Sequence, residues 1–342
     1  MNEKDEYFRR DCYTYIDGQG FTQYDRYSVE RRTLAYFSLC LGWCLLLSLL
    51  LSAVMPFILM YGTKLFMPAV RFYNNQVISK KFVFYIVGTI SYFIAITLPF
   101  GFMVIKNKIP RGVVVPSRSV PAMTLLSAVC VCMGTAVAGA FCAWLISQLL
   151  GQLGFAVIAP EFPLTRLDGA SVFVLLVQLL VVAPLVEEFA FRGVIMGVLR
   201  RWGDGFAVMT SACLFAMFHR NMSQFPNAFL CGMVIGCAVV YTGSVWTGVI
   251  MHVVNNLLAV GLTYFQSIGN DFMMWMQLSL MFLAGIAGFA FIASSGNTIW
   301  HKRQSCLCDD ESEKYRMFFS QPVQLVCMMV MLSGIIHNIK RI

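Results

Sequence analysis

The sequence predicts an all-α, polytopic membrane protein with about eight transmembrane helices and a ninth candidate. Of its 342 residues, 58% are hydrophobic and only 12% are charged, and the mean hydropathy is +0.72. A soluble domain carries about a quarter charged residues. Apolar windows long enough to cross a bilayer recur along the chain. We expect helices in them because lipid offers no partner to an unpaired backbone amide.

The apolar windows follow one another from residue 34 onward. The eight long ones are 34–62, 82–105, 123–151, 169–199, 206–219, 226–243, 245–265 and 272–295, and a shorter ninth runs over 319–336. The first window is about twice as long as the core of a signal peptide and lacks a small-residue cleavage site, so we expect it to be retained as the insertion signal.

Charged and proline-rich stretches divide the chain into parts. Residues 1–33 form a polar, aromatic tail that we expect in the cytoplasm, and 34–105 hold two N-terminal membrane helices. The basic stretch 106–122, with four cations and three prolines, reads as a cytoplasmic linker. We predict one membrane core over 123–295, followed at 296–342 by a charged loop and a C-terminal apolar segment. Within that core the loops are very short, so consecutive helices should be antiparallel neighbours.

The positive charge has a topological explanation. The net charge is +8, but Lys and Arg concentrate on cytoplasmic loops of membrane proteins. With the N-terminus inside, sixteen cations fall in inner segments and eight in outer ones, and Arg192 lies within the membrane. We therefore predict a cytoplasmic N-terminus and the bilayer, not a nucleic acid, as partner. The expected location is the plasma membrane of a bacterium, although no residue pattern identifies the host.

The cysteines do not indicate a disulfide scaffold. Of twelve, nine lie in apolar runs, where Cys acts as a small packing residue. Cys306 and Cys308 follow His301 in a charged loop, a spacing that resembles part of a zinc site but lacks a fourth ligand. We expect these two to be free thiols on the reducing side of the membrane.

Adjacent carboxylates at the end of an uncharged stretch are the most informative feature. Ionised groups at bilayer depth cost several kcal/mol unless they are offset, so Glu187 and Glu188 mark a candidate functional site. Glu188 and Arg192 stand four residues apart on one helical face and are expected to pair. Glu187 points about 100° away and should remain available to the interior.

Two neighbouring apolar segments carry further polar groups at the same spacing. Phe215 and His219 are four residues apart, so the ring can support the imidazole, and His252 and Asn256 share a face in the same way. At about 1.5 Å per residue, Glu187, His219 and His252 lie at depths that agree within a couple of turns. We predict that they converge on one cavity reached from the cytoplasm.

These three pairs resemble a known signature. Glu187-Glu188-x3-Arg192, Phe215-x3-His219 and His252-x3-Asn256, in this order, are similar to the motifs of the CPBP intramembrane proteases, also called the Abi or CAAX prenyl protease 2-like family. The resemblance covers about 170–265 closely and 123–295 loosely.

The resemblance implies a CAAX-protease-like intramembrane endopeptidase that cleaves a membrane-associated or hydrophobic peptide or protein. Glu187 would be the general base that activates a water held by His219, while His252 and Asn256 would donate to the oxyanion. The supporting residues would be Glu188, Arg192 and Phe215.

Cofactor use leaves two alternatives. Glu187, His219 and His252 would form a plausible zinc set, and the family is often labelled as metalloproteases. We favour a metal-free enzyme because the ligands come from three helices without a His-Glu-x-x-His core, and because Asn is a poor zinc ligand.

Two other classes of function share these residues. Buried Glu and His also serve proton-coupled transporters, which commonly show repeated halves, but the chain has no duplicated segment. A non-catalytic membrane scaffold would tend to lose motif residues, whereas all are kept here. The sequence does not determine the substrate or the oligomeric state.

Overall fold

The computed structural model of the chain describes residues 12–16, 20–24, 26–66, 72–73, 76–77, 82–160, 164–294 and 311–342. It confirms an all-α polytopic membrane protein. Within these residues seven helices are long and apolar enough to cross a membrane, or eight if a bent C-terminal pair counts as one span. The predicted motif around His301, Cys306 and Cys308 lies outside the described residues.

Most helices closely match the predicted windows; the short helices within 111–114 and 311–319 lie outside them. Outside the fourth window the helices are α2 (Arg26–Phe66), α3 (Phe82–Lys106), α4 (Arg111–Val114), α5 (Ala122–Gln152), α9 (Asp204–Phe218), α10 (Phe225–Thr242), α11 (Val245–Ser267), α12 (Asp271–Ser294), α13 (Glu311–Phe319) and α14 (Pro322–His337). The bent pair is α13 and α14, which meet at 78°. The bend precedes Pro322, whose ring fits the first turn of a helix but cannot continue one.

The fourth span is one helical rod, Gly169–Trp202, whose geometry changes along its length. Its parts are α6 (Gly169–Val177), the π-helical η2 (Gln178–Val182), α7 (Ala183–Glu188), the π-helical η3 (Phe189–Met196), α8 (Gly197–Leu199) and the 3₁₀ turn η4 (Arg200–Trp202). Pro184 opens α7 and would clash with the carbonyl of Leu180 in a regular helix, which explains the widened turn before it. Wide turns of this kind are frequent at functional sites.

Strands are few and short in the described part of the chain. The antiparallel pairs are β1 (Cys12–Ile16) with β2 (Gly20–Tyr24), β3 (Phe72–Tyr73) with β4 (Gln76–Val77), and β5 (Phe155–Val157) with β6 (Ile339–Arg341). The last pair ties the loop after α5 to the C-terminal end of the chain.

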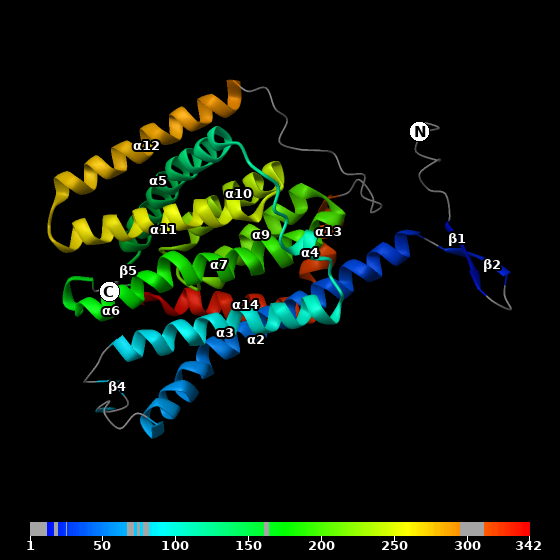
Figure 1. The fold of residues 1–342 in the computed structure, drawn as a ribbon, viewed down its shortest axis with the longest axis horizontal. Coiled ribbons are helices and arrows are strands. Elements are labelled where there is room, and N and C mark those ends of the chain that lie inside the picture. Colours follow the sequence, from blue (N-terminus) through cyan, green and yellow to red (C-terminus); the bar gives the residue numbers. More distant parts are fainter. Residues whose placement is uncertain are drawn as a thin grey trace.

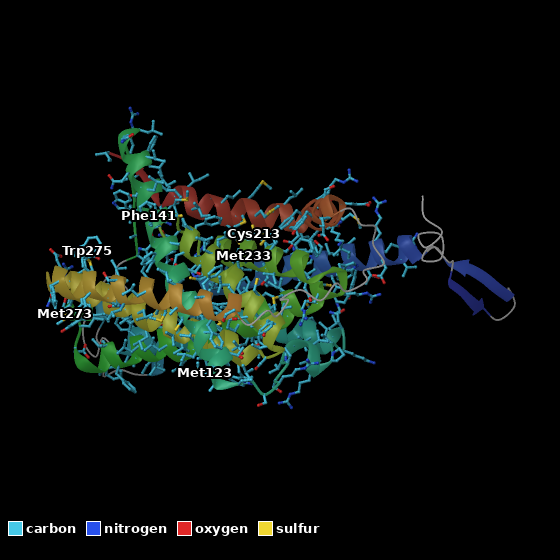
Figure 2. All side chains as sticks on the ribbon, turned by 90° about the horizontal axis from the view of Figure 1, so that it is seen from above. Met123, Phe141, Cys213, Met233, Met273 and Trp275 are labelled. Atoms are coloured by element: carbon cyan, nitrogen blue, oxygen red, sulfur yellow. The ribbon has the colours of Figure 1, made fainter. Side chains whose placement is uncertain are left out.

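The outer surface of the bundle is apolar. Phe141 on α5 is 59% exposed and Trp275 on α12 is 63% exposed, and both lie at the outside of the molecule in Figure 2. Exposed apolar side chains on such long helices are compatible with lipid and would be costly in water. The described cysteines of these helices are free, as expected for packing residues.

The bundle encloses α7 and α9. Figure 1 shows α5, α10, α11 and α12 on one side of them and α2, α3 and α14 on the other, an arrangement that the helix contacts support. Helix α9 has only fifteen residues, and most of its side chains are buried. Because protein and not lipid surrounds it, α9 need not match the thickness of the bilayer.

The basic linker packs against the fourth span. A Cβ added to Gly193 would lie 2.5 Å from the carbonyl oxygen of Val114, and one added to Gly197 would lie 2.8 Å from that of Val113. Glycine is therefore required for this close approach. The linker is held again where Val245 N–H donates to the carbonyl of Pro116 over 2.8 Å. The predicted division of the chain at 106–122 stays a prediction, but the linker contacts the core directly.

Candidate active site

The predicted pair of Glu188 and Arg192 is present and completely buried. Arg192 Nη1 lies 3.0 Å from Glu188 Oε1, and the two side chains are 1% and 0% exposed. Arg192 Nη2 also donates to the carbonyl of Gly232 on α10 over 3.2 Å, and the guanidinium lies 4.5 Å from the centre of the Phe215 ring. The cation is thus held by α9, α10 and its own helix.

Glu188 has little room on its other side. A Cβ added to Gly248 on α11 would lie 2.8 Å from Glu188 Oε2. The missing side chain lets α11 approach the carboxylate closely, and small residues commonly permit such approaches between membrane helices. Gly248 therefore brings the next candidate residue, His252, to the same carboxylate.

His252 bridges the two glutamates. Its Nδ1 lies 2.9 Å from Glu188 Oε1, and its Nε2 lies 3.7 Å from Glu187 Oε2. The sequence predicted that His252 would face Glu187; it did not indicate the second contact. Glu188, beside a guanidinium, is an ionised acceptor, so Nδ1 carries the proton in this hydrogen bond.

Glu187 is buried, but its two oxygens have different surroundings. Oε1 accepts a hydrogen bond from the hydroxyl of Tyr92 on α3. Oε2 has no hydrogen-bond partner among the described side chains and faces His252. Glu188 Oε2 likewise has no hydrogen-bond partner among the described residues, so the predicted asymmetry lies in the charge: Glu188 pairs with Arg192, and Glu187 has no Lys or Arg partner there.

Tyr92 is the residue that the sequence analysis missed. It lies in the second apolar window, far from the three motifs, and a tyrosine there carries no spacing signal toward Glu187. Its proximity depends on α3 packing against the fourth span, which also places Thr89 Oγ1 3.2 Å from Gln178 Oε1. Only the tertiary structure brings this hydroxyl to the carboxylate.

His219 joins the cluster through Phe215. The ring centres of Phe215 and His219 are 4.8 Å apart, edge to face, and Phe215 meets His252 in the same way at 5.7 Å. The predicted support of the imidazole by Phe215 is therefore present. His219 Nδ1 lies 2.9 Å from the carbonyl oxygen of Phe215. Because a carbonyl oxygen only accepts hydrogen bonds, Nδ1 carries the proton in this contact. In a neutral ring, Nε2 can then accept a hydrogen bond.

Asn256 lies one turn beyond His252 and turns toward the fourth span. Its Nδ2 donates to the carbonyl of Leu179 in η2 over 2.9 Å. An amide nitrogen carries two hydrogens, so this bond orients the side chain and leaves a second donor. Asn255, its neighbour, points to α10, where Cys231 Sγ lies 3.7 Å from Asn255 Oδ1.

A polar pocket of about 560 Å³ lies beside His219. It is lined by Pro160, His219, Arg220, Asn221, Gln224, Ser333, Gly334, His337 and Asn338. This pocket is at the end of α9 that faces β5 and β6, away from the basic linker. Helix α9 ends at Phe218 with His219 as its cap, close to the end of the predicted window 206–219. The predicted access from the cytoplasm stays a prediction.

The buried cluster contains one arginine and two carboxylates. Arg192 pairs with Glu188, and His252 lies between Glu188 and Glu187. Pairing is favourable where water is excluded, because isolated ionised groups there cost several kcal/mol. The arrangement offers a carboxylate oxygen, an imidazole acceptor and N–H donors to a reacting group.

The zinc alternative bears on the same histidines. Within the described ranges, no group of three or more His, Cys, Asp or Glu side chains is placed to hold a metal ion. His252 Nδ1 is engaged by Glu188 and His219 Nδ1 by a backbone carbonyl, which leaves Nε2 of each ring available, as in histidines that bind metals. The metal-free and the zinc-dependent versions both stay predictions.

A helical membrane protein with a buried Glu, His and Asn site is the class that these observations define. Residues 169–258 match the family model described as Type II CAAX prenyl endopeptidase Rce1-like, about a quarter of the chain. No curated protein and no solved structure matches the chain. The match confirms the resemblance seen in the motifs and supports a membrane endopeptidase in general.

We expect the buried ion pair to dominate the stability of the site. Removing one partner of such a pair leaves an uncompensated charge and costs about 3–5 kcal/mol. Arg192→Met should therefore lower the thermal unfolding temperature of the detergent-purified protein strongly. The matched control is Arg201→Met, which removes the cation of a more exposed pair with Glu30 and should cost about 1 kcal/mol or less. Equal losses in the two variants would contradict this view.

Proposed function

We propose that the protein is an intramembrane endopeptidase that hydrolyses a peptide bond in a membrane-associated or hydrophobic peptide or protein. The single observation that carries the proposal is the environment of Glu187: a buried carboxylate with one oxygen that no described side chain occupies. This oxygen faces His252 Nε2 at 3.7 Å, and no described Lys or Arg pairs with Glu187, whereas Glu188 pairs with Arg192. The family match over 169–258 supports the reaction type.

Glu187 would act as the general base. Its free oxygen, Oε2, takes a proton from a water molecule, and the resulting hydroxide attacks the carbonyl carbon of the scissile bond. A carboxylate within reach of the water can take its proton in this way. His219 would hold this water, because the acceptor nitrogen of its ring is left free by the bond from Nδ1 to Phe215.

His252 and Asn256 would stabilise the tetrahedral intermediate. Its negative oxygen would accept from His252 Nε2–H and from the second N–H of Asn256 Nδ2. Donors fixed in a dry site stabilise such an oxyanion strongly because they need no reorganisation during the reaction. The proton held by Glu187 then passes to the leaving amine as the C–N bond breaks, and the base is restored. Glu188, Arg192 and Phe215 would hold His252 and His219 in place.

The proposed substrate is a prenylated peptide, and the proposed location is a membrane. The family name points to a prenylated peptide as the first substrate to test, and the bilayer would present its hydrophobic part. We also propose that the N-terminus is cytoplasmic and that the protein resides in the plasma membrane of a bacterium. The excess of cations in the segments that this orientation places inside supports the topology.

Loss of the base should abolish cleavage and preserve the fold. We expect Glu187→Gln to lower the rate at least about 100-fold, since a general base contributes about 10²–10⁴-fold. The rate is measured on purified protein with an internally quenched, prenylated peptide. Comparative peptidomics of cells that express either form would reveal natural substrates. Asp271→Asn, at an exposed carboxylate outside the site, serves as the control. Unchanged cleavage by Glu187→Gln would refute the proposal.

Adjacent asparagines allow a matched test of the oxyanion donors. Asn256→Ala should reduce kcat about 10²–10³-fold, the usual effect of removing one such donor. Asn255→Ala, one residue earlier on the same helix, should leave kcat near the wild-type value because its side chain faces Cys231. A comparable loss of kcat in both variants would assign the effect to helix packing.

Metal dependence separates the two versions of the enzyme. We expect cleavage of the quenched peptide to continue in the presence of a strong chelator, and elemental analysis to find no stoichiometric zinc in active protein. Zinc at one equivalent, together with loss of cleavage in chelator and recovery on adding zinc back, would establish the zinc-dependent alternative with Glu187, His219 and His252 as the first ligands to examine.

A further inference from the structure

Tyr92 connects the N-terminal helices to the candidate active site. It lies on α3, outside the segment that matches the family, and its hydroxyl donates to Glu187 Oε1. One turn earlier on α3, Thr89 Oγ1 lies 3.2 Å from Gln178 Oε1 at the beginning of η2. Two polar contacts therefore hold α3 in one register against the span that carries Glu187.

The hydroxyl makes the two oxygens of Glu187 inequivalent. The last torsion of a glutamate side chain is broad, so a carboxylate with no hydrogen bond can rotate and exchange its oxygens. The bond from Tyr92 occupies Oε1, and Oε2 then lies 3.7 Å from His252 Nε2. Glu188 and Arg192 are paired with each other, and among the described residues the Glu187 carboxylate has its polar contacts with Tyr92 and His252.

We propose that Tyr92 is a positioning residue for Glu187 and that it directs Oε2, as the basic oxygen, toward the reacting water. This inference rests on the proposed function and deepens it, because it makes the N-terminal part of the chain a component of the active site. Tyr92 acts through Glu187 and does not touch the substrate. Positioning of this kind is sensitive, since a displacement of about 1 Å can cost about 100-fold in rate.

The effect on turnover can be separated from an effect on packing. Tyr92→Phe keeps the ring and removes only the donor, so we expect kcat to fall about 10–100-fold while KM stays within about twofold. The matched control is Tyr85→Phe, about two turns earlier on α3. The Tyr85 ring packs on Phe84 at 5.6 Å, and its hydroxyl makes no hydrogen bond within the described part of the chain, so kcat should not change.

Rescue identifies the donor as the cause. Replacement of Tyr92 by 4-aminophenylalanine restores an N–H donor at the same place and should recover most of the lost kcat. All variants are compared with wild type in the quenched-peptide assay and by thermal unfolding in detergent. The assignment would be overturned if 4-aminophenylalanine did not restore kcat. It would also be overturned if Tyr85→Phe lowered kcat as much as Tyr92→Phe does.

An infrared measurement tests the contact without any substrate. The difference between wild type and Glu187→Gln isolates the carboxyl bands of Glu187, which should shift in Tyr92→Phe and not in Tyr85→Phe. Unshifted bands overturn the inference. If Glu187→Gln still cleaves the peptide, the proposed function fails; if Glu187→Gln is inactive and Tyr92→Phe retains full kcat, only the role of Tyr92 fails.

Discussion

The ion pair between Glu188 and Arg192 is the interaction on which the rest of the site depends. Both groups are completely buried, so neither can exist in its ionised form without the other. Arg192 also reaches Gly232 on α10 and the Phe215 ring on α9, and Glu188 accepts from His252 on α11. One electrostatic requirement thus holds four helical segments around a common centre.

Neutralising Glu188 is what allows Glu187 to differ from it. The two residues are adjacent, but the helix turns them to different neighbours, and His252 contacts both. Glu188 fixes one nitrogen of the imidazole, so the other is directed at Glu187. A buried polar network of this kind orients a functional group through the contacts that its members share, here the contact of His252 with both carboxylates.

The segment that matches the family does not form the site alone. Residues 169–258 supply the glutamates, both histidines and Asn256, but Tyr92 comes from α3 and the polar pocket beside His219 includes residues of α14. The basic linker packs on the same span through Gly193. The flanking parts of the chain therefore shape the surroundings of the cluster, although they lie outside the matched segment.

Much of this protein follows from its sequence alone. Apolar windows determine where the membrane helices run, because lipid demands satisfied backbone groups, and the four-residue spacing pairs Glu188 with Arg192 on one helix. Contacts between helices are different, because they depend on packing that no local spacing encodes. Only the tertiary structure placed Tyr92 on Glu187, turned His252 between both glutamates, and put His219 at the end of a short, enclosed α9 beside a pocket.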